Sequence, residues 1–334
     1  MKAIVCTKYG PPDVLQLKEI EKPAPKDNEV LVKIHASSVN FNILAYVSGK
    51  PLFARLMGIG FLKPKCKIPG GDIAGLVETV GVNVKQFKPG DAVFGNLDGC
   101  GFGAFAEYVC APENALALKP TNISFEEAAA AVQAAVVALQ GLRKGQIQPG
   151  QKVLIYGASG GIGTFAVQIA KSFGDEVTGV CSTKNLELVR SIGADHVIDY
   201  TKEDFTRSGQ LYDLILTTAG YRSIFDYKRA LSPKGIYVMV GGSMKGSNAM
   251  AQVFQALLLG PLISKTGSKK LGGLTAKASQ KDLVFIKELI EAGKVKPVIE
   301  RRYKLSEVAE ALRYYAERHA KGKVVITVEQ NSKD

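Results

Sequence analysis

The apolar residues of the first 122 positions fall in short runs that alternate with polar residues, and glycine or proline turns separate these runs. Residues 30–34, Val-Leu-Val-Lys-Ile, show the period of two that is typical of a half-buried strand. Residues 89–91, Pro-Gly-Asp, predict a turn into the next run. Strands are predicted over residues 1–5, 30–34, 73–80, 92–94 and 104–109. We therefore expect this part to form a compact, barrel-like β domain.

The pattern changes after Asn122, where helical periods alternate with apolar runs. Ser124, followed by Glu126, predicts a capped helix through the alanine-rich stretch that follows. Residues 153–156, Val-Leu-Ile-Tyr, are apolar without interruption, as expected of a central parallel strand that is buried on both faces. Further helices are predicted over residues 162–173 and 185–192, and further strands over 176–180, 196–198, 214–216 and 236–240. Repeated units of this kind predict an α/β fold with a doubly wound parallel sheet.

The end of the chain lacks this alternation of strands, glycine turns and helices. We predict helices over residues 281–292 and 306–316 and a closing strand over 323–328, and we expect them to pack on the first domain. The predicted domains are residues 1–122 with 280–334, and residues 123–279.

Composition and charge narrow the function only a little. Hydrophobic residues make up 46% of the 334 positions and charged residues 22%, which is ordinary for a globular protein. The net charge of +12 is compatible with an anionic partner such as nucleic acid, anionic lipid or a phosphorylated cofactor. Because the chain has no block of five like charges, we interpret the charge as scattered, solvated lysines and expect no nucleic-acid partner.

Cysteines and apolar runs bear on the compartment. The 5 cysteines are widely spaced, and no secretory signal opens the sequence, so a reducing compartment with free thiols is expected. The longest apolar stretch, residues 253–263, is too short to span a bilayer and is interrupted by Gly260-Pro261. We therefore expect a cytoplasmic protein without an integral membrane segment.

The strongest local signal is a glycine-rich loop at residues 157–163, Gly-Ala-Ser-Gly-Gly-Ile-Gly, between a predicted strand and a predicted helix. Glycines allow the backbone there to turn tightly and to approach a pyrophosphate, which the N–H groups of the helix then bind. Many glycine turns only connect elements, but this one has the strand–turn–helix context that dinucleotide binding requires. The predicted cofactor-binding residues here are Ser159, Gly160, Gly161 and Ile162, together with Gly241 after the strand at 236–240.

The end of the next strand distinguishes NADPH from NADH. A site for NADH usually has Asp or Glu there, which accepts a hydrogen bond from the ribose 2′-hydroxyl. This chain instead has Ser182 and Lys184, and its first acidic residue is Glu187. Ser182 can donate to a 2′-phosphate and Lys184 can neutralise it, so NADPH is the predicted cofactor. Alternatively, Ser182 caps the helix that begins near Asn185.

Several motifs together resemble the medium-chain dehydrogenase/reductase superfamily, specifically its zinc-independent quinone oxidoreductase branch. They are residues 37–40 (Ser-Ser-Val-Asn), 69–75 (Pro-Gly-Gly-Asp-Ile-Ala-Gly), 88–91 (Lys-Pro-Gly-Asp), 105–109 (Phe-Ala-Glu-Tyr-Val), 193–200 (Gly-Ala-Asp-His-Val-Ile-Asp-Tyr) and the glycine loop. The resemblance implies a GroES-like β-barrel catalytic domain, a Rossmann cofactor domain and a homodimer. It also implies that Tyr200 lies near the adenosine phosphate. Residues 269–275 occupy the position where such enzymes have a dimer-forming edge strand.

The resemblance also implies that a zinc site is absent. Zinc-dependent relatives carry a Gly-His-Glu motif whose histidine binds the metal, and the matching residues here are Gly70, Gly71 and Asp72. A catalytic zinc needs three protein ligands. The three histidines, His35, His196 and His319, are far apart in the sequence and have no ligand spacing. We expect no metal.

Without zinc, hydrogen-bond donors must polarise a substrate carbonyl. Asn40 matches an active-site asparagine of this branch, and Tyr46 is a nearby hydroxyl that has packing against residues 52–53 as its alternative role. The predicted reaction is hydride transfer from NADPH to a small-molecule carbonyl substrate, either a quinone or the C=C bond of an α,β-unsaturated carbonyl compound.

Some positions depart from the pattern of the branch. Ile43, Ser48, Val137 and Thr217 stand where aspartate, arginine, threonine and aspartate are common, which suggests an apolar substrate pocket. The same departures leave open a second hypothesis, a non-catalytic NADPH-binding redox sensor or interaction protein. Residues 50–62 form an apolar, glycine-containing stretch for which we expect packing within the domain, with a lid or a membrane-facing patch as the alternatives.

Overall fold

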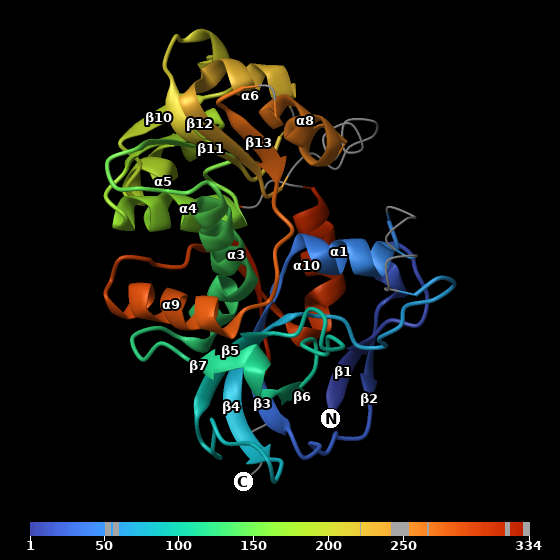
Figure 1. The fold of residues 1–334 in the computed structure, drawn as a ribbon. Helices are drawn as coiled ribbons and strands as arrows, with labels where there is room; N and C mark the ends of the chain where they lie inside the picture. Colours follow the sequence, from blue (N-terminus) through green and yellow to red (C-terminus); the bar gives the residue numbers. More distant parts are fainter. Residues whose placement is uncertain are drawn as a thin grey trace. The chain divides into compact units, whose positions relative to one another are not determined.

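The computed structural model describes residues 1–50, 55, 60–220, 222–241, 254–265, 267–317 and 321–329 (Figure 1). The chain forms two compact units. Unit 1 contains residues 1–133, 278–291 and 297–334, and unit 2 contains residues 134–277 and 292–296. Compared with the expected limit at residue 122, the first boundary falls inside helix α3 (Phe125–Lys144), which contributes to both units.

Unit 1 is built on a seven-stranded mixed sheet with the order β14-β15-β3-β4-β5-β7, in which β6 also pairs with β3. Its strands are β3 (Glu29–Val39), β4 (Asp72–Val80), β5 (Ala92–Asn96), β6 (Tyr108–Pro112), β7 (Leu116–Leu118), β14 (Ile299–Lys304) and β15 (Lys323–Thr327). A separate pair joins β1 (Lys2–Val5) to β2 (Gln16–Glu19). Because β15 pairs antiparallel with β3, the end of the chain is part of the unit 1 sheet.

One predicted strand of unit 1 is displaced. The strand predicted over residues 104–109 begins only at Tyr108. The backbone N–H groups of Ala104 and Phe105 instead donate to the carbonyls of Gly70 and Pro69, each at 3.0 Å, so they are not available to a sheet ladder.

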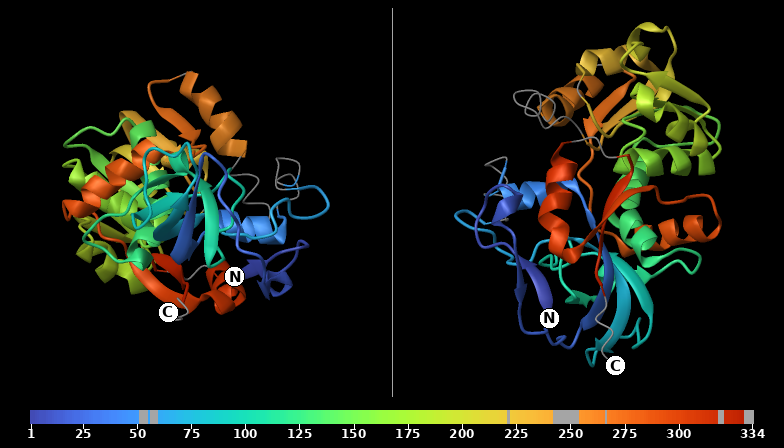
Figure 2. Two further views of the ribbon diagram at one scale, coloured as in Figure 1. Left: turned by 90° about the horizontal axis from the view of Figure 1, so that it is seen from below. Right: turned by 180° about the vertical axis from the view of Figure 1, so that it is seen from behind.

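Helices cover the unit 1 sheet and complete its core. Helix α10 (Val308–Ala316) packs on β3 and β15, and helix α9 (Gln280–Glu291) packs on β7 (Figure 2). Helix α1 (Phe41–Ser48) follows β3 and buries Ile43 and Val47 completely. The predicted cap of α3 is confirmed: the Glu127 N–H donates to Ser124 Oγ at 3.2 Å, and the Ser124 N–H donates to Glu127 Oε2 at 2.9 Å.

Unit 2 is a six-stranded parallel sheet with the order β10-β9-β8-β11-β12-β13. Its strands are β8 (Lys152–Tyr156), β9 (Glu176–Cys181), β10 (His196–Asp199), β11 (Tyr212–Thr217), β12 (Leu231–Met239) and β13 (Lys270–Gly273), and its further helices are α4 (Gly161–Ser172), α5 (Leu186–Ser191), α6 (Ile224–Ala230) and α8 (Gly260–Lys265) (Figure 1). The chain passes outward through β8, β9 and β10, returns to the centre and continues through β11, β12 and β13. This is the doubly wound Rossmann order, and the prediction of an α/β fold is confirmed.

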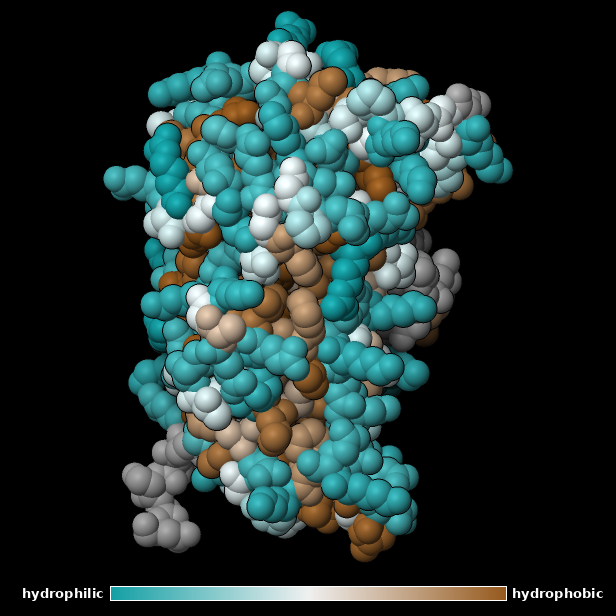
Figure 3. Space-filling view, turned by 60° about the vertical axis from the view of Figure 1, so that its left-hand side comes forward, coloured by the Kyte–Doolittle hydropathy of each residue, from teal (hydrophilic) through white to brown (hydrophobic). Residues whose placement is uncertain are grey.

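The surface that Figure 3 presents is mainly hydrophilic, which agrees with the ordinary fractions of charged and hydrophobic residues in the sequence. Hydrophilic side chains cover most of the face that Figure 3 shows, with smaller hydrophobic patches between them. None of the helices in the described ranges has both the length and the hydropathy of a membrane-spanning helix. Of the apolar stretch at residues 253–263, the part from Phe254 onward forms a π-helical turn (Gln255–Leu259) and the start of α8, and residue 253 lies outside the described ranges.

Candidate functional site

The glycine loop between β8 and α4 lies where the strand order of the unit 2 sheet reverses, between β8 and β11. Gly157 has φ +86°, and a Cβ there would lie 2.6 Å from Thr218 Oγ1. A Cβ at Gly163 would overlap the carbonyl oxygen of Gly157. Both positions therefore require glycine. Gly160 precedes α4 without a side-chain cap, which leaves the N–H groups of the first helical turn available to an anion.

Ser182, Lys184 and Tyr200 lie at the same edge of the sheet. Ser182 follows β9 and Tyr200 follows β10, and the Tyr200 N–H donates to the carbonyl of Cys181 at 3.1 Å, which holds the two strand ends together. Lys184 is exposed and forms no ion pair within the described ranges. The Tyr200 side chain is 48% exposed. The structure thus brings together three residues that the sequence places up to 18 positions apart.

The alternative role of Ser182 as a helix cap is not observed in the structure. Its side chain makes no capping hydrogen bond to the 3-10 turn Thr183–Asn185. Instead, Ser182 Oγ accepts a hydrogen bond from Asn185 Nδ2 at 3.3 Å, and Asn185 Nδ2 also donates to Ser159 Oγ at 3.0 Å. The sequence gives no signal for Asn185, because the residue stands at an ordinary helix start and its link to Ser159 spans 26 positions.

The sequence also gives no signal for Arg222, which lies near the same strand ends. Its guanidinium group forms an ion pair with Asp204 at 2.9 Å and lies over the ring of Phe205, with 5.3 Å between the guanidinium carbon and the ring centroid. Burial raises the pKa of the neighbouring Tyr156 phenol, while Arg222 opposes this rise. The ring of Tyr156 lies 6.3 Å from that of Tyr200. No motif in the sequence links these residues, since they belong to three different strand ends.

On the side of β11 and β12, the residues of the predicted cofactor edge make close contacts with backbone carbonyl groups. Thr218 Oγ1 donates to the carbonyls of Tyr156 (3.1 Å) and Gly157 (3.0 Å), and a Cβ at Gly241 would overlap the carbonyl of Thr218. Thr217, which replaces the aspartate common in the branch, is fully buried and lies 3.2 Å from the hydroxyl of Tyr237. The Thr217 side chain is therefore directed into the core of unit 2.

Unit 1 has a buried polar cluster around Asp72 at the end of β3. The Asp72 carboxylate accepts hydrogen bonds from Ser38 Oγ (2.6 Å), Asn96 Nδ2 (3.0 Å) and Asn40 Nδ2 (3.3 Å). Lys323 Nζ lies 3.7 Å from Asp72 Oδ2, and only 4% of Lys323 is exposed. Burial lowers the pKa of Lys323, while the nearby Asp72 carboxylate opposes this effect. The cluster thus balances a buried carboxylate with a buried ammonium group and neutral donors.

The two predicted catalytic residues differ in the hydrogen-bonding groups that remain available to a substrate. Asn40 caps α1, because its Oδ1 accepts from the Ile43 N–H at 3.1 Å, and its Nδ2 has one hydrogen beyond the bond to Asp72. The Tyr46 hydroxyl donates to the carbonyl of Cys66 (2.8 Å) and accepts from the N–H of Cys66 (2.6 Å). Burial raises the pKa of Tyr46. Because Tyr46 is 2% exposed and uses its hydroxyl internally, that hydroxyl is not available to a substrate in this structure.

The Tyr46 ring packs 4.7 Å from the ring of Phe102, measured between centroids. Residues 52–53, its expected packing partners, lie outside the described ranges, as does most of the stretch at residues 50–62.

Asp98 fills the space that a side chain at position 71 would need. A Cβ at Gly71 would overlap Asp98 Oδ1, which is buried and has no hydrogen-bond partner in the described part of the chain. Asp98 Oδ2 accepts from Asn42 Nδ2 (2.8 Å) and Gln133 Nε2 (2.6 Å). Burial, and then the charge of Asp72, raise the pKa of Asp98 to about 6. The carboxyl group of Asp98, which follows β5, thus takes the space of a side chain at position 71, where the resemblance implies a histidine in zinc-dependent enzymes.

The histidines of the described residues do not assemble a metal site. His35 stacks on Phe125 with 4.4 Å between ring centroids, and burial lowers its pKa. His196 lies on the surface, 3.1 Å from Glu176. Within the part of the chain that the structure describes, no three His, Cys, Asp or Glu residues are grouped so that they could hold a metal ion. His319 lies outside the described ranges.

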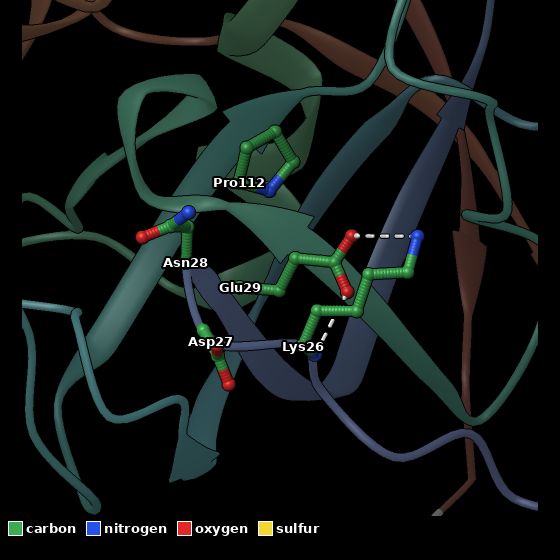
Figure 4. Close-up of a pocket in the computed structure, with 5 residues that line it drawn as sticks. All are labelled: Lys26, Asp27, Asn28, Glu29 and Pro112. Carbon is green, nitrogen blue, oxygen red and sulfur yellow. Dashed lines mark hydrogen bonds and ion pairs between the residues drawn. The ribbon is translucent and has the colours of Figure 1, made fainter.

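A surface pocket of unit 1 is separate from these clusters. It has a volume of about 560 Å³ and is lined by Lys26, Asp27, Asn28, Glu29 and Pro112 (Figure 4). Its polar groups bind one another, since the Lys26 N–H donates to Glu29 Oε2 at 3.1 Å. Glu29 begins β3 and Val39 ends it, so the pocket and the Asp72 cluster are on the order of 30 Å apart along the strand.

Comparisons with known proteins agree with this architecture. Residues 26–121 match the alcohol dehydrogenase GroES-like domain family, and residues 192–326 match the family described as zinc-binding dehydrogenase. The chain is 34% identical to the NADPH-dependent alkenal/one oxidoreductase, chloroplastic, of Arabidopsis thaliana and 35% identical to the 2-methylene-furan-3-one reductase of Solanum lycopersicum. Each alignment covers 98% of this chain and 79% of the relative.

The solved structures lead to the same group. The quinone oxidoreductase from Coxiella burnetii superposes with a TM-score of 0.84 at 28% identity, over 98% of this chain and 99% of that chain. Full-length similarity, the GroES-like match and the doubly wound sheet therefore have one explanation. The chain belongs to the medium-chain dehydrogenase/reductase superfamily, in its zinc-independent quinone oxidoreductase-like branch of NAD(P)H-dependent oxidoreductases.

Proposed function

We propose that this protein is an NADPH-dependent reductase that delivers a hydride to a quinone or to the C=C bond of an α,β-unsaturated carbonyl compound. The observation that carries the proposal is the cofactor edge of unit 2, where a glycine loop lies at the reversal of the strand order and Ser182 with Lys184 replaces a carboxylate at the end of β9. The relatives named for alkenal/one, methylene-furanone and quinone substrates support the substrate class.

The residues at this edge fit the cofactor. Ser159, Gly160, Gly161 and Ile162 present a hydroxyl and the N–H groups of the first turn of α4 to the pyrophosphate. Ser182, Lys184 and Tyr200 serve the 2′-phosphate end, where a carboxylate would repel the added charge. Gly241 has no side chain and lets the chain pass close to Thr218. A bound NADPH supplies the hydride, and the protein orients the reacting groups and excludes water.

Of the two predicted catalytic residues, Asn40 is the one that keeps a hydrogen-bond donor for a substrate. Hydride addition to the β-carbon of an enone, or to a quinone, leaves negative charge on the carbonyl oxygen, and the second Nδ2 hydrogen of Asn40 can stabilise that charge. The Asp72 and Ile43 contacts hold the Asn40 amide in a single orientation. Ile43 itself is fully buried in the core of unit 1, so its replacement of aspartate reflects packing.

The second candidate is a non-catalytic NADPH-binding sensor. It is favoured by the internal use of polar groups on the substrate side, where Asn40 Oδ1 and the Tyr46 hydroxyl are both bound within the protein. Binding of NADPH without turnover of any compound in the substrate panel described below would select it.

We also propose a homodimer that forms through β13. This strand is at one edge of the unit 2 sheet, next to the π-helical turn and α8. Large apolar side chains there are exposed: Phe254 (58%), Leu257 (51%), Leu258 (57%) and Leu262 (59%). An exposed edge strand beside an apolar patch is a common protein interface. Light scattering after size exclusion tests the proposal, and a monomer at micromolar concentration would contradict it.

The test of function is oxidation of NADPH by the purified protein, followed by absorbance, with NADH in parallel. The panel contains quinones, 2-alkenals and cyclic enones, with the saturated analogue of each as a matched control. Turnover of an enone or quinone with a clear preference for NADPH is the expected result. Turnover with NADH alone would contradict the assignment of Ser182 and Lys184.

A further inference from the structure

We infer that Asn185 is a positioning residue that directs the hydroxyl hydrogens of Ser159 and Ser182 outward, towards the two phosphate positions of the dinucleotide. The inference rests on the proposed use of NADPH and adds the residue that prepares its binding site.

Asn185 connects two separate loops of unit 2 from a buried position. It ends the 3-10 turn after β9, only 7% of it is exposed, and its N–H donates to the carbonyl of Ser182 at 2.9 Å. Its Nδ2 donates to Ser159 Oγ at 3.0 Å and to Ser182 Oγ at 3.3 Å. One amide group therefore joins the glycine loop to the end of β9.

These two bonds determine what each serine can donate. A hydroxyl has one hydrogen and two lone pairs, and an amide nitrogen can only donate. Ser159 and Ser182 therefore use a lone pair towards Asn185 and keep their hydrogens for another acceptor. Within the described ranges, neither hydroxyl has a further hydrogen-bond partner, and both serines are partly exposed.

The positions of the serines indicate that the missing acceptors are phosphates. Ser159 lies in the loop that precedes the N-terminus of α4, and Ser182 lies two positions before Lys184, whose ammonium group forms no ion pair with any described residue. Both hydroxyls are thus donors in a region of positive potential.

The cost of this arrangement is visible at Asn185 Oδ1, which is buried and has no hydrogen-bond partner among the residues that the structure describes. The opposite orientation of the amide would let Oδ1 accept from both serines and would turn their hydrogens inward. An unpaired Oδ1 is consistent with a site whose donors are kept for a ligand.

The test is a set of dissociation constants for NADPH and NADH, measured by calorimetry on the full chain. We expect Asn185→Ala to weaken NADPH binding roughly tenfold, the usual scale for lost hydrogen bonds to a charged group, and NADH binding less, because only Ser159 faces a phosphate that both cofactors share. In a Ser159→Ala/Ser182→Ala background, Asn185→Ala should have no further effect on either cofactor. A role in folding alone would instead lower affinity equally in both backgrounds, and that result would overturn the inference.

Asn185→Asp tests the direction of the hydrogen bonds at constant side-chain shape. A carboxylate accepts from both serines, so NADPH binding should fall below that of Asn185→Ala. Ser191→Asp, at the exposed end of α5, is the charge-matched control and should change NADPH affinity less than twofold. An equal loss in the control would attribute the effect to charge and refute the inference.

The outcomes also separate this inference from the proposed function. A wild-type protein that binds neither cofactor would refute both. A wild-type protein that binds NADPH and reduces enones, together with an Asn185→Ala variant of unchanged affinity, would refute the inference alone.

Discussion

The buried pair of Lys323 and Asp72 makes a quantitative prediction about the stability of unit 1. Lys323 Nζ lies 3.7 Å from Asp72 Oδ2 and donates to the carbonyl of Val39 at 3.3 Å. Lys323 is 4% exposed and Asp72 is fully buried. Lys323→Met keeps the length and the apolar stem of the side chain and removes the ammonium group, with its charge and its hydrogen bond to Val39, so Asp72 loses its cation while it remains out of water.

The expected cost follows from this burial. Removal of one partner of a buried ion pair typically destabilises a protein by about 3–5 kcal/mol, because the remaining charge is left without compensation. Asp72→Asn should cost a similar amount, since it isolates the ammonium group. The double variant lacks both charges of the pair, so its loss should be smaller than the sum of the single losses by about 2–3 kcal/mol.

The assay is urea unfolding followed by circular dichroism, because the chain contains no tryptophan for fluorescence. Lys26→Met is the matched control. Lys26 Nζ lies 3.9 Å from Glu29 Oε1, a similar separation, but the Lys26 side chain is 86% exposed, so this variant should change the free energy of unfolding by less than about 0.5 kcal/mol. A Lys323→Met variant as stable as this control, or a coupling energy below about 0.5 kcal/mol, would refute the reasoning.

Three further predictions concern single positions. Gly71→Ala should destabilise unit 1 by about 1–3 kcal/mol because its Cβ overlaps Asp98 Oδ1, and Asp98→Ala in the same chain should restore most of the loss; a double variant no more stable than Gly71→Ala would contradict the overlap. Asp175 is buried, and burial is the main reason that its pKa is raised to about 6. As the pH rises from about 4 to 6, the unfolded state loses the Asp175 proton before the folded state does, so the free energy of unfolding falls. Asp175→Asn should therefore gain stability relative to wild type above pH 6, by up to about 3 kcal/mol, and gain nothing below pH 4, which thermal unfolding at both pH values can check. Lys184→Gln should weaken NADPH binding roughly 5- to 50-fold and leave NADH binding unchanged, and an equal loss for both cofactors would argue against a 2′-phosphate contact.

The residues of the proposed cofactor edge could be placed at one edge of the sheet from the sequence because they are local to strand ends. The glycine loop follows an apolar run directly, and Ser182 and Lys184 follow the next strand, so the order of elements alone places them at one edge. Contacts between distant segments were not predictable. Lys323 is the first residue of the predicted closing strand, and nothing in its neighbourhood indicates that β15 would bring it to Asp72 across 251 positions.

The displaced strand at residues 104–109 has a similar cause. Its alternation is that of a strand, but the loop at residues 69–70 takes its first N–H groups, and only the tertiary structure decides between the two partners. Tyr46 is a parallel case, since its hydroxyl is consumed by the backbone of Cys66. In both cases the sequence shows which groups can form hydrogen bonds, but it does not determine which distant group each of them binds.

The two candidate clusters differ in how much of their hydrogen-bonding capacity is used. Around Asp72, the carboxylate accepts from the Ser38 hydroxyl and from one Asn40 amide hydrogen, Asn40 Oδ1 accepts from the Ile43 N–H, and one Asn40 amide hydrogen remains. At the cofactor edge, two serine hydroxyl hydrogens and the Lys184 ammonium group remain. Donors held ready for a ligand give affinity, whereas a single oriented donor in a satisfied network gives little affinity and acts on charge that develops during reaction. Substitutions at the cofactor edge should therefore change the Michaelis constant for NADPH, and substitutions around Asn40 should change mainly kcat.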